Sequence, residues 1–259
     1  QATELFIKVL AIEPDNGNVH IDLGRVHQEQ GRFQDALDCY DRGLTLKPYS
    51  TRAIALKGEV LLAAGRHREL AFLVDFDRLI QIQTIDVPDE FDSLQDFNQA
   101  MVEYAVNHPS LGTPANKATT NGRHTGDLND GVEGNPVRHL IDFIQKSTML
   151  YYDHRPSDPG HPFLSQDPGP RSIEIWATVL DRKGHQQTHI HPGSWLSGVY
   201  YAKVPDEVRR DDPDQTGWIE FSNPRTYPAF ISEIPTRYFL PEEGPMFLFP
   251  SYFWHRTVP

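Results

Sequence analysis

Hydrophobic and polar residues recur with two different periods along this chain. In the first third, apolar residues return every three or four positions, which is the spacing of one face of an α-helix. In the last third the spacing changes to two: Ile173, Ile175, Ala177 and Val179 alternate with other residues, and Gly and Pro separate short apolar segments. The pattern predicts a helical N-terminal region followed by a region rich in β-strands.

The helical region contains an internal repeat. Pro14 and Pro48, Gly24 and Gly58, and Gly31 and Gly65 are each 34 residues apart. This period, with a small residue in the first helix, a glycine turn and a proline after the second helix, is typical of the tetratricopeptide (TPR) repeat. We therefore predict a TPR-like array over residues 1–85. Within it, residues 5–14 resemble the second helix of a preceding truncated repeat, and residues 70–85 are predicted to form the last helix.

A second domain is predicted over residues 86–259. Its expected helices cover residues 93–107 and 137–152, and a loop of about 25 residues, 112–136, precedes the second helix. The expected strands are residues 173–179, ending at an Asp181–Gly184 turn, and residues 195–204, 218–222 and 246–254.

Composition narrows the range of partners. A formal net charge of −12 argues against binding to nucleic acid or to anionic membranes. Cys39 is the single cysteine, which excludes an intrachain disulfide and favours a reducing, cytoplasmic location. No apolar run approaches the ~20 residues that a transmembrane helix needs. Because the chain starts with Gln1 and stops at Pro259 within a predicted strand-to-loop passage, we expect it to be a fragment of a longer protein.

Three histidines are the strongest candidates for chemistry. His189 and His191 stand two residues apart in an extended segment, so their side chains point to the same face. His255 follows the apolar segment 246–254, which is predicted to bring a third imidazole to the same place. Imidazoles on a β-scaffold that leave coordination positions open suit non-haem Fe(II). A structural zinc site would need a fourth ligand, and no convincing one is nearby.

These histidines lie in two motifs that carry a family resemblance. The segments His189-Ile190-His191-Pro192-Gly193-Ser194 and Phe249-Pro250-Ser251-Tyr252-Phe253-Trp254-His255 resemble those of a bacterial and phage branch of the 2-oxoglutarate-dependent Fe(II) oxygenase superfamily. Residues 121–128 resemble the same branch, and the likeness covers roughly the last 160 residues. It implies an α+β chain in which the helical array precedes a double-stranded β-helix (jelly-roll or cupin-like) domain with flanking helices.

The resemblance also implies the site. Fe(II) would be bound by His189, His191 and His255, and 2-oxoglutarate would be the co-substrate, converted to succinate. Tyr200 or Tyr201 resembles a strand tyrosine that binds the co-substrate carboxylate, and Ser251 is a further candidate. The cation that usually pairs with this carboxylate would follow about ten residues after His255, beyond the chain end.

The early motif departs from the usual His-x-Asp or His-x-Glu pattern of the superfamily. Three assignments remain open: both His189 and His191 bind the metal, only one binds and water completes the shell, or a carboxylate arrives from elsewhere. Glu220 is the nearest candidate for that carboxylate.

Two further groups of residues bear on the site. Arg123-His124-Thr125 is a candidate lid loop, because closing loops shield reactive oxidants from water. The four tryptophans, at positions 176, 195, 218 and 254, are predicted to lie mainly in the core.

The first hypothesis for function is a Fe(II)- and 2-oxoglutarate-dependent dioxygenase that hydroxylates a protein or peptide recruited by the TPR repeats, since repeat arrays form extended concave surfaces. The first alternative is a non-catalytic TPR scaffold with an inactive β-domain. The second is a three-histidine, cupin-type metal enzyme that does not use 2-oxoglutarate.

Overall fold

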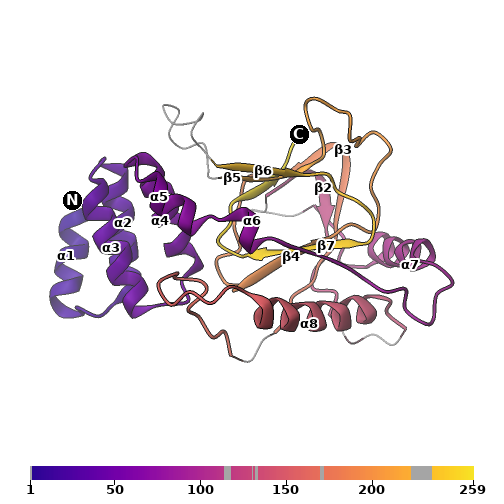
Figure 1. The fold of residues 1–259 in the computed structure, drawn as a ribbon, viewed down its shortest axis with the longest axis horizontal. Coiled ribbons are helices and arrows are strands. Elements are labelled where there is room, and N and C mark those ends of the chain that lie inside the picture. Colours follow the sequence, from indigo (N-terminus) through magenta and orange to yellow (C-terminus); the bar gives the residue numbers. More distant parts are fainter. Residues whose placement is uncertain (1, 114–117, 130, 132–133, 170–171, 223–234) are drawn as a thin grey trace.

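The computed structural model describes residues 2–113, 118–129, 131, 134–169, 172–222 and 235–259. Figure 1 shows a helical array at the N-terminal end of the molecule and a body of antiparallel sheets at the other, with further helices beside the sheets. Among the described residues, no helix combines the length and the apolar character that crossing a membrane requires.

The N-terminal array is built as predicted from paired helices (Figure 1). They are α1 (Ala2–Ile12), α2 (Gly17–Glu29), α3 (Phe33–Leu46), α4 (Thr51–Ala63) and α5 (His67–Leu73). Asn16 and Ser50 cap α2 and α4, each accepting a hydrogen bond from a backbone amide three residues later. Gly24 lets α2 approach α3, because a Cβ at this position would lie 2.6 Å from Cε1 of Tyr40. The 34-residue period therefore reflects real helix pairs.

The last helix predicted for the array is not continuous. The single helix predicted over residues 70–85 is wrong: α5 stops at Leu73, α6 (Phe76–Leu79) is one short turn, and β1 (Gln81–Thr84) is a strand. The side chain of Asp75 accepts a hydrogen bond from the amide of Arg78 and so begins α6 as a new helix. A carboxylate that bonds nearby backbone competes with continuous helix, and this local effect ends α5.

Two antiparallel sheets pack face to face, as in a jelly roll. One sheet has the strand order β1-β7-β4 and the other has β6-β5-β8. The bounds of the strands other than β1 are β4 (Leu196–Tyr200), β5 (Ile219–Ser222), β6 (Thr236–Phe239), β7 (Pro245–Pro250) and β8 (His255–Thr257). Phe249 of β7 contacts Phe221 of β5 with ring centroids 4.8 Å apart, and Phe247 contacts Phe239 of β6 at 5.4 Å. The fold is thus α+β, with helical repeats followed by a double-stranded β-helix.

The segment predicted to be strand 246–254 divides in two. β7 ends at Pro250, a turn covers residues 251–253, and β8 begins at His255. His255 therefore opens a strand in the opposite sheet, whereas the sequence placed it at the end of one. Pro250 and the Ser251-Tyr252 sequence after it favour the turn. The prediction missed the turn because it treated the whole apolar run as one strand.

A separate pair of strands, β2 (Thr119–His124) and β3 (Thr178–Gln186), lies beside these sheets. β2 falls within the predicted loop 112–136, so that part of the prediction is wrong; residues 114–117, 130, 132 and 133 of the loop lie outside the described residues. β3 runs through the expected Asp181–Gly184 turn. The residues of that turn form a bulge instead, with a register shift opposite Asn121 and a positive φ of 63° at Lys183.

The two predicted flanking helices are present as α7 (Leu94–Asn107) and α8 (Val137–His154). Ser93 caps α7 by accepting a hydrogen bond from the amide of Asp96. Phe97 of α7 and Leu140 of α8 belong to one small buried cluster. In Figure 1, α8 runs along the β1-β7-β4 sheet and α7 lies at the end away from the repeats.

The repeats are joined to the sheets by a continuous core. One buried cluster extends from Ile21 in α2 to Phe253 in the turn before β8. The hydroxyl of Tyr252 donates to the carbonyl of Leu73 at 2.6 Å, and β1 pairs with β7 from Gln81↔Leu248 to Thr84↔Pro245. The segment that forms β1 was predicted to belong to the last helix of the repeats, and it instead completes a sheet of the C-terminal part.

Candidate metal centre

Backbone pairing brings the two histidine motifs together. His189 and His255 form an antiparallel bridge, with the amide of each bonded to the carbonyl of the other at 3.0 and 3.1 Å. The amide of His191 donates to the carbonyl of Ser251 at 3.0 Å. Because His189 and His191 alternate along an extended segment, one strand-like pairing places both imidazoles beside His255.

The three imidazoles converge on one point. Their ligand nitrogens all lie within 4.8 Å of one another. The ring centroids of His189 and His255 are 4.2 Å apart, those of His189 and His191 5.0 Å, and those of His191 and His255 5.2 Å. Neutral nitrogen donors held this closely, without a thiolate, suit Fe, Zn or Cu. The residues present therefore fit a single transition-metal ion.

Backbone carbonyls orient two of the three rings. Nδ1 of His189 lies 2.7 Å from the carbonyl of Gln187, and Nδ1 of His255 lies 2.9 Å from the carbonyl of Phe253. A carbonyl accepts hydrogen bonds only, so these contacts place the proton on Nδ1 and leave Nε2 with its lone pair. Metal-binding histidines are commonly fixed in this way by the partner of their other nitrogen.

Burial keeps these rings neutral. Desolvation lowers the pKa of His189, and its hydrogen bond to Gln187 opposes this effect only partly. The pKa of His255 lies well below its usual range, first because the ring is buried and then because His189 and His191 are adjacent. A neutral imidazole is the form that binds metal, so His189 and His255 need no deprotonation to accept an ion near neutral pH.

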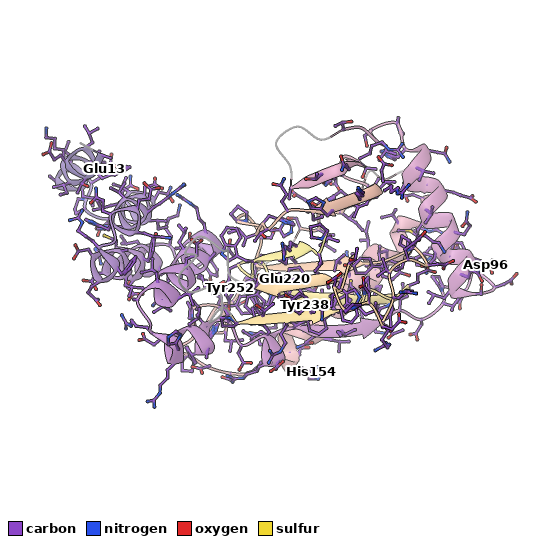
Figure 2. All side chains as sticks on the ribbon, turned by 90° about the horizontal axis from the view of Figure 1, so that it is seen from above. Glu13, Asp96, His154, Glu220, Tyr238 and Tyr252 are labelled. Atoms are coloured by element: carbon purple, nitrogen blue, oxygen red, sulfur yellow. The ribbon has the colours of Figure 1, made fainter. Side chains whose placement is uncertain are left out.

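Glu220, the carboxylate that the sequence offered as a replacement ligand, is engaged elsewhere. Its Oε2 accepts hydrogen bonds from Nε and Nη2 of Arg256 at 2.9 and 2.5 Å, and its Oε1 accepts from the hydroxyl of Ser222 at 2.8 Å. In the β5–β8 register Glu220 stands opposite Arg256, so both point away from the face that carries His255. Figure 2 shows Glu220 among the central strands. The group of candidate ligands found in the described part of the chain consists of the three histidines.

The cluster has an apolar wall on one side. The ring of Phe249 is 4.8 Å from that of His255, and Phe221 is 6.0 Å from it. Both phenylalanines are fully buried, so this side excludes water.

On its other side the cluster meets an exposed aromatic residue. Trp176 lies 5.7 Å from His191 between ring centroids and is 39% exposed. The expectation that the tryptophans lie in the core holds for Trp195, which stacks on Phe163, but not for Trp176. The sequence contained an indication of this exposure, because Trp176 falls between the apolar positions Ile175 and Ala177 of the alternating segment and so belongs to its other face.

The candidate lid is part of regular structure. Arg123 and His124 end strand β2, and His124 stacks on Trp176 at 5.6 Å. The Thr125 amide and hydroxyl bond to the backbone of Ala177. Residues 123–125 therefore form a fixed support for Trp176.

The two tyrosines of the β4 region point in opposite directions. Tyr200 packs against Phe97 of α7 and donates its hydroxyl to Oδ1 of Asn98 at 2.5 Å, and burial raises its pKa to about 12. Tyr201 contacts Phe247, which faces the opposite sheet, and burial raises its pKa as well. Of the two, Tyr201 shares the inner face with the histidine cluster.

Ser251, the third predicted co-substrate contact, is fully buried. Its hydroxyl lies 2.7 Å from that of Ser197 in β4. Ser197 was not singled out from the sequence, although it is four residues before Tyr201 and so lies on the same strand face.

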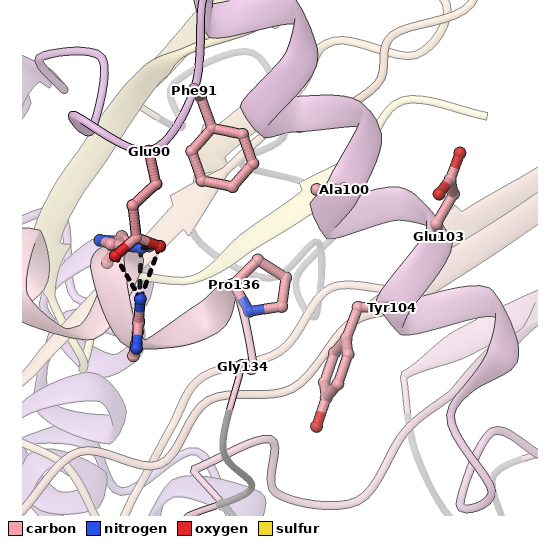
Figure 3. A pocket seen from close by; sticks show the side chains of 9 residues that line it. Glu90, Phe91, Ala100, Glu103, Tyr104, Gly134 and Pro136 are labelled. Carbon is pink, nitrogen blue, oxygen red and sulfur yellow. Dashed lines mark hydrogen bonds and ion pairs between the residues drawn. The ribbon is translucent and has the colours of Figure 1, made fainter.

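A hollow of about 390 Å³ lies between α7 and α8, and its lining includes none of the three clustered histidines (Figure 3). Phe91, Tyr104 and Pro136 line it, and Glu90 at its rim accepts hydrogen bonds from Arg138 and His139. The carboxylate of Glu90 is already hydrogen-bonded to these two side chains, and the hollow has no part in the metal centre.

Two family models match parts of this chain. Residues 174–259 match the family model described as "Putative 2OG-Fe(II) oxygenase", and residues 1–60 match the model described as "Tetratricopeptide repeat". No curated protein matches the chain. Among solved structures, it is similar to a prolyl hydroxylase in complex with a hypoxia inducible factor oxygen degradation domain peptide fragment from Trichoplax adhaerens. That similarity has a TM-score of 0.48 at 10% identity and covers 76% of this chain and 86% of that one.

The chain is thus a tetratricopeptide-repeat protein with a C-terminal 2-oxoglutarate/Fe(II)-dependent oxygenase domain. As an enzyme it is a 2-oxoglutarate/Fe(II)-dependent dioxygenase, with Fe(II) as its metal and 2-oxoglutarate as its co-substrate. When bound, these two supply the oxidising power for inserting oxygen into a substrate while 2-oxoglutarate is converted to succinate.

Proposed function

We propose that this dioxygenase hydroxylates a protein or peptide that its TPR repeats recruit, and that His189, His191 and His255 hold the iron. The observation that carries the proposal is the convergence of the three imidazoles, with ligand nitrogens within 4.8 Å, inside the matched oxygenase segment. With Glu220 paired to Arg256, a three-histidine face is the assignment that the geometry favours.

We also propose roles for the residues around the iron. The hydroxyl of Tyr201 and the Ser197–Ser251 pair would bind a carboxylate of 2-oxoglutarate, since hydroxyl donors on the inner face can reach a carboxylate placed beside the metal. Phe249 and Phe221 would keep water from the buried side of the cluster. The substrate would approach from the side of Trp176, the exposed aromatic residue beside His191.

Recruitment by the repeats is supported by how closely they adjoin the site. Helix α4 of the array contacts the loop that carries His191 through the Thr51–Pro192 hydrogen bond. A peptide bound to the array would therefore be held close to the iron, which raises its effective concentration there.

The proposal is tested by mixing the protein with Fe(II) and 2-oxoglutarate and measuring succinate. We expect wild-type protein to form succinate and His255→Ala to abolish turnover, because the substitution removes a buried ligand that burial keeps neutral. His154→Ala is the matched control, since this exposed histidine ends α8 and lies outside the cluster.

Two outcomes would contradict the proposal. Wild-type protein that takes up no transition metal after anaerobic loading would favour the non-catalytic scaffold. Oxygen consumption that does not depend on added 2-oxoglutarate would favour the three-histidine, cupin-type enzyme. Hydroxylation itself is read from a substrate peptide as a mass increase of one oxygen atom.

A further inference from the structure

The loop before α4 and the first residue of α4 contact the oxygenase domain at three positions. The carbonyl of Pro48 accepts a hydrogen bond from Nε2 of Gln166 at 2.7 Å, and the hydroxyl of Tyr49 donates to the carbonyl of Asp167 at 3.0 Å. The hydroxyl of Thr51 donates to the carbonyl of Pro192 at 2.6 Å. The last of these contacts reaches the residue that directly follows His191.

Pro192 lies in the tight turn at the tip of the histidine loop. The amide of Ser194 donates to the carbonyl of His191 at 3.2 Å and closes this turn. Backbone bonds to His255 and Ser251 hold the loop to β8 and to the turn before it. Those bonds hold the backbone of His189 and His191, and the Thr51 hydroxyl holds the next residue, Pro192, from the side of the repeats.

Helix α4 is a firm support for this contact. Thr51 is its first residue and is 1% exposed. Ser50 caps the helix, and Ile54 and Leu61 are fully buried in the cluster that continues into the sheets. A hydroxyl on such a helix has little freedom to move, so its bond restrains the loop more than a surface contact would.

We propose that Thr51 is a positioning residue for the metal centre, through which the repeat array holds the His191 loop in its metal-binding conformation. This inference rests on the proposed function, because it takes His189 and His191 as metal ligands. A loop held in place before the ion arrives loses less conformational entropy on binding, so metal affinity is higher. The repeats thereby act on the iron site as well as on the substrate.

The test compares two pairs of variants at position 51, each pair differing by the hydroxyl. Threonine is compared with Thr51→Val, and Thr51→Ser is compared with Thr51→Ala. The full chain is titrated anaerobically with Fe(II) against a competing chelator, and with Co(II) while its visible absorption is recorded. Losing one hydrogen bond of ordinary strength should weaken metal binding about three- to tenfold within each pair.

Tyr49→Phe is the matched control, because it removes a nearby hydroxyl whose partner, the carbonyl of Asp167, belongs to a segment that carries none of the three clustered histidines. We expect it to lower the midpoint of thermal unfolding slightly and to leave metal affinity and the Co(II) spectrum unchanged. If Thr51→Val fails to fold, the serine and alanine variants still isolate the hydroxyl at a smaller side chain.

Each result bears on the inference differently. Equal metal affinities within both pairs would overturn it while leaving the proposed function intact. An equal loss of affinity in Tyr49→Phe would also overturn it, since the effect would then come from general stability. Wild-type protein that binds neither Fe(II) nor Co(II) would overturn the proposed function and this inference together.

Discussion

At the scale of single residues, orientation on a strand separates residues that look equivalent in the sequence. Tyr200 and Tyr201 are adjacent, and either matched the tyrosine expected near the co-substrate. The β4–β7 register places Tyr200 opposite Met246 and Val199 opposite Phe247, so Tyr200 faces α7 while Tyr201 faces the interior. Alternation predicts that the two differ but not which one faces inward, since that depends on the packing of both sheets.

This difference gives a prediction at the residue scale. Tyr201→Phe should raise the KM for 2-oxoglutarate by roughly ten- to a hundredfold, the effect of losing a hydrogen bond to a charged group. Tyr200→Phe should leave that KM unchanged and lower the free energy of unfolding, because it leaves Asn98 without its bond from Tyr200. Steady-state succinate formation measures the first effect and urea denaturation the second. A raised KM in Tyr200→Phe alone would reverse the assignment.

At the scale of elements, buried polar groups hold neighbouring elements together. Glu220 and Arg256 link β5 to β8 directly beside His255. The carboxylate that the sequence offered as a metal ligand therefore serves to join two strands. In the repeats, Nε2 of Gln28 in α2 donates to Oε2 of Glu59 in α4, and the hydroxyl of Tyr40 in α3 donates to Oε1 of Gln28. One glutamine thus connects three helices.

The repeat network predicts a dependence of stability on pH. Burial raises the pKa of Glu59 from an ordinary 4.5 to about 7, and the bond from Gln28 offsets this only partly. Between these values the folded chain binds a proton that the unfolded chain has released. The contribution of Glu59 to stability is therefore full below about pH 4.5 and falls as the pH rises towards 7.

Glu59→Gln removes this titration. The difference in free energy of unfolding between variant and wild type should shift in favour of the variant by up to roughly 3 kcal/mol between pH 4.5 and pH 8. Urea denaturation across this range measures the shift. Glu4→Gln in exposed α1 is the control and should show no such change. Parallel pH profiles for Glu59→Gln and wild type would show that Glu59 does not carry the proton.

At the scale of the whole molecule, the repeats and the oxygenase domain share a core. The predicted boundary after residue 85 falls just past β1, yet β1 pairs with β7, and one apolar cluster runs from α2 to the turn before β8. Figure 2 shows Tyr252 lying between the helices and the strands. We therefore expect the two parts to unfold as a single cooperative unit.

A destabilising substitution in the repeats should therefore also lower the stability of the sheets. Ile54→Ala in α4 removes a fully buried side chain, which costs roughly 2–5 kcal/mol in a packed core. All four tryptophans lie after residue 171, so their fluorescence follows the C-terminal part alone. The midpoint of urea unfolding followed by tryptophan fluorescence should fall, and it should coincide with the midpoint from far-UV circular dichroism. An unchanged fluorescence midpoint would mean that the repeats unfold independently.

The sequence by itself determined the features that depend on nearby residues. The 34-residue period predicted the helix pairs, the helical pattern of residues 93–107 and 137–152 predicted α7 and α8, and the spacing of His189 and His191 placed both imidazoles on one face. Helix periodicity, capping and strand alternation act over a few residues, so a linear pattern is sufficient to predict them.

Only the tertiary structure decided which distant residues meet. The bridge from His189 to His255, the pairing of Glu220 with Arg256 and the bond from Thr51 to Pro192 each join segments far apart in the chain. Such contacts are set by strand register and by the packing of one element on another. A shift of one residue in register would exchange the faces of a whole strand while leaving its sequence pattern unchanged.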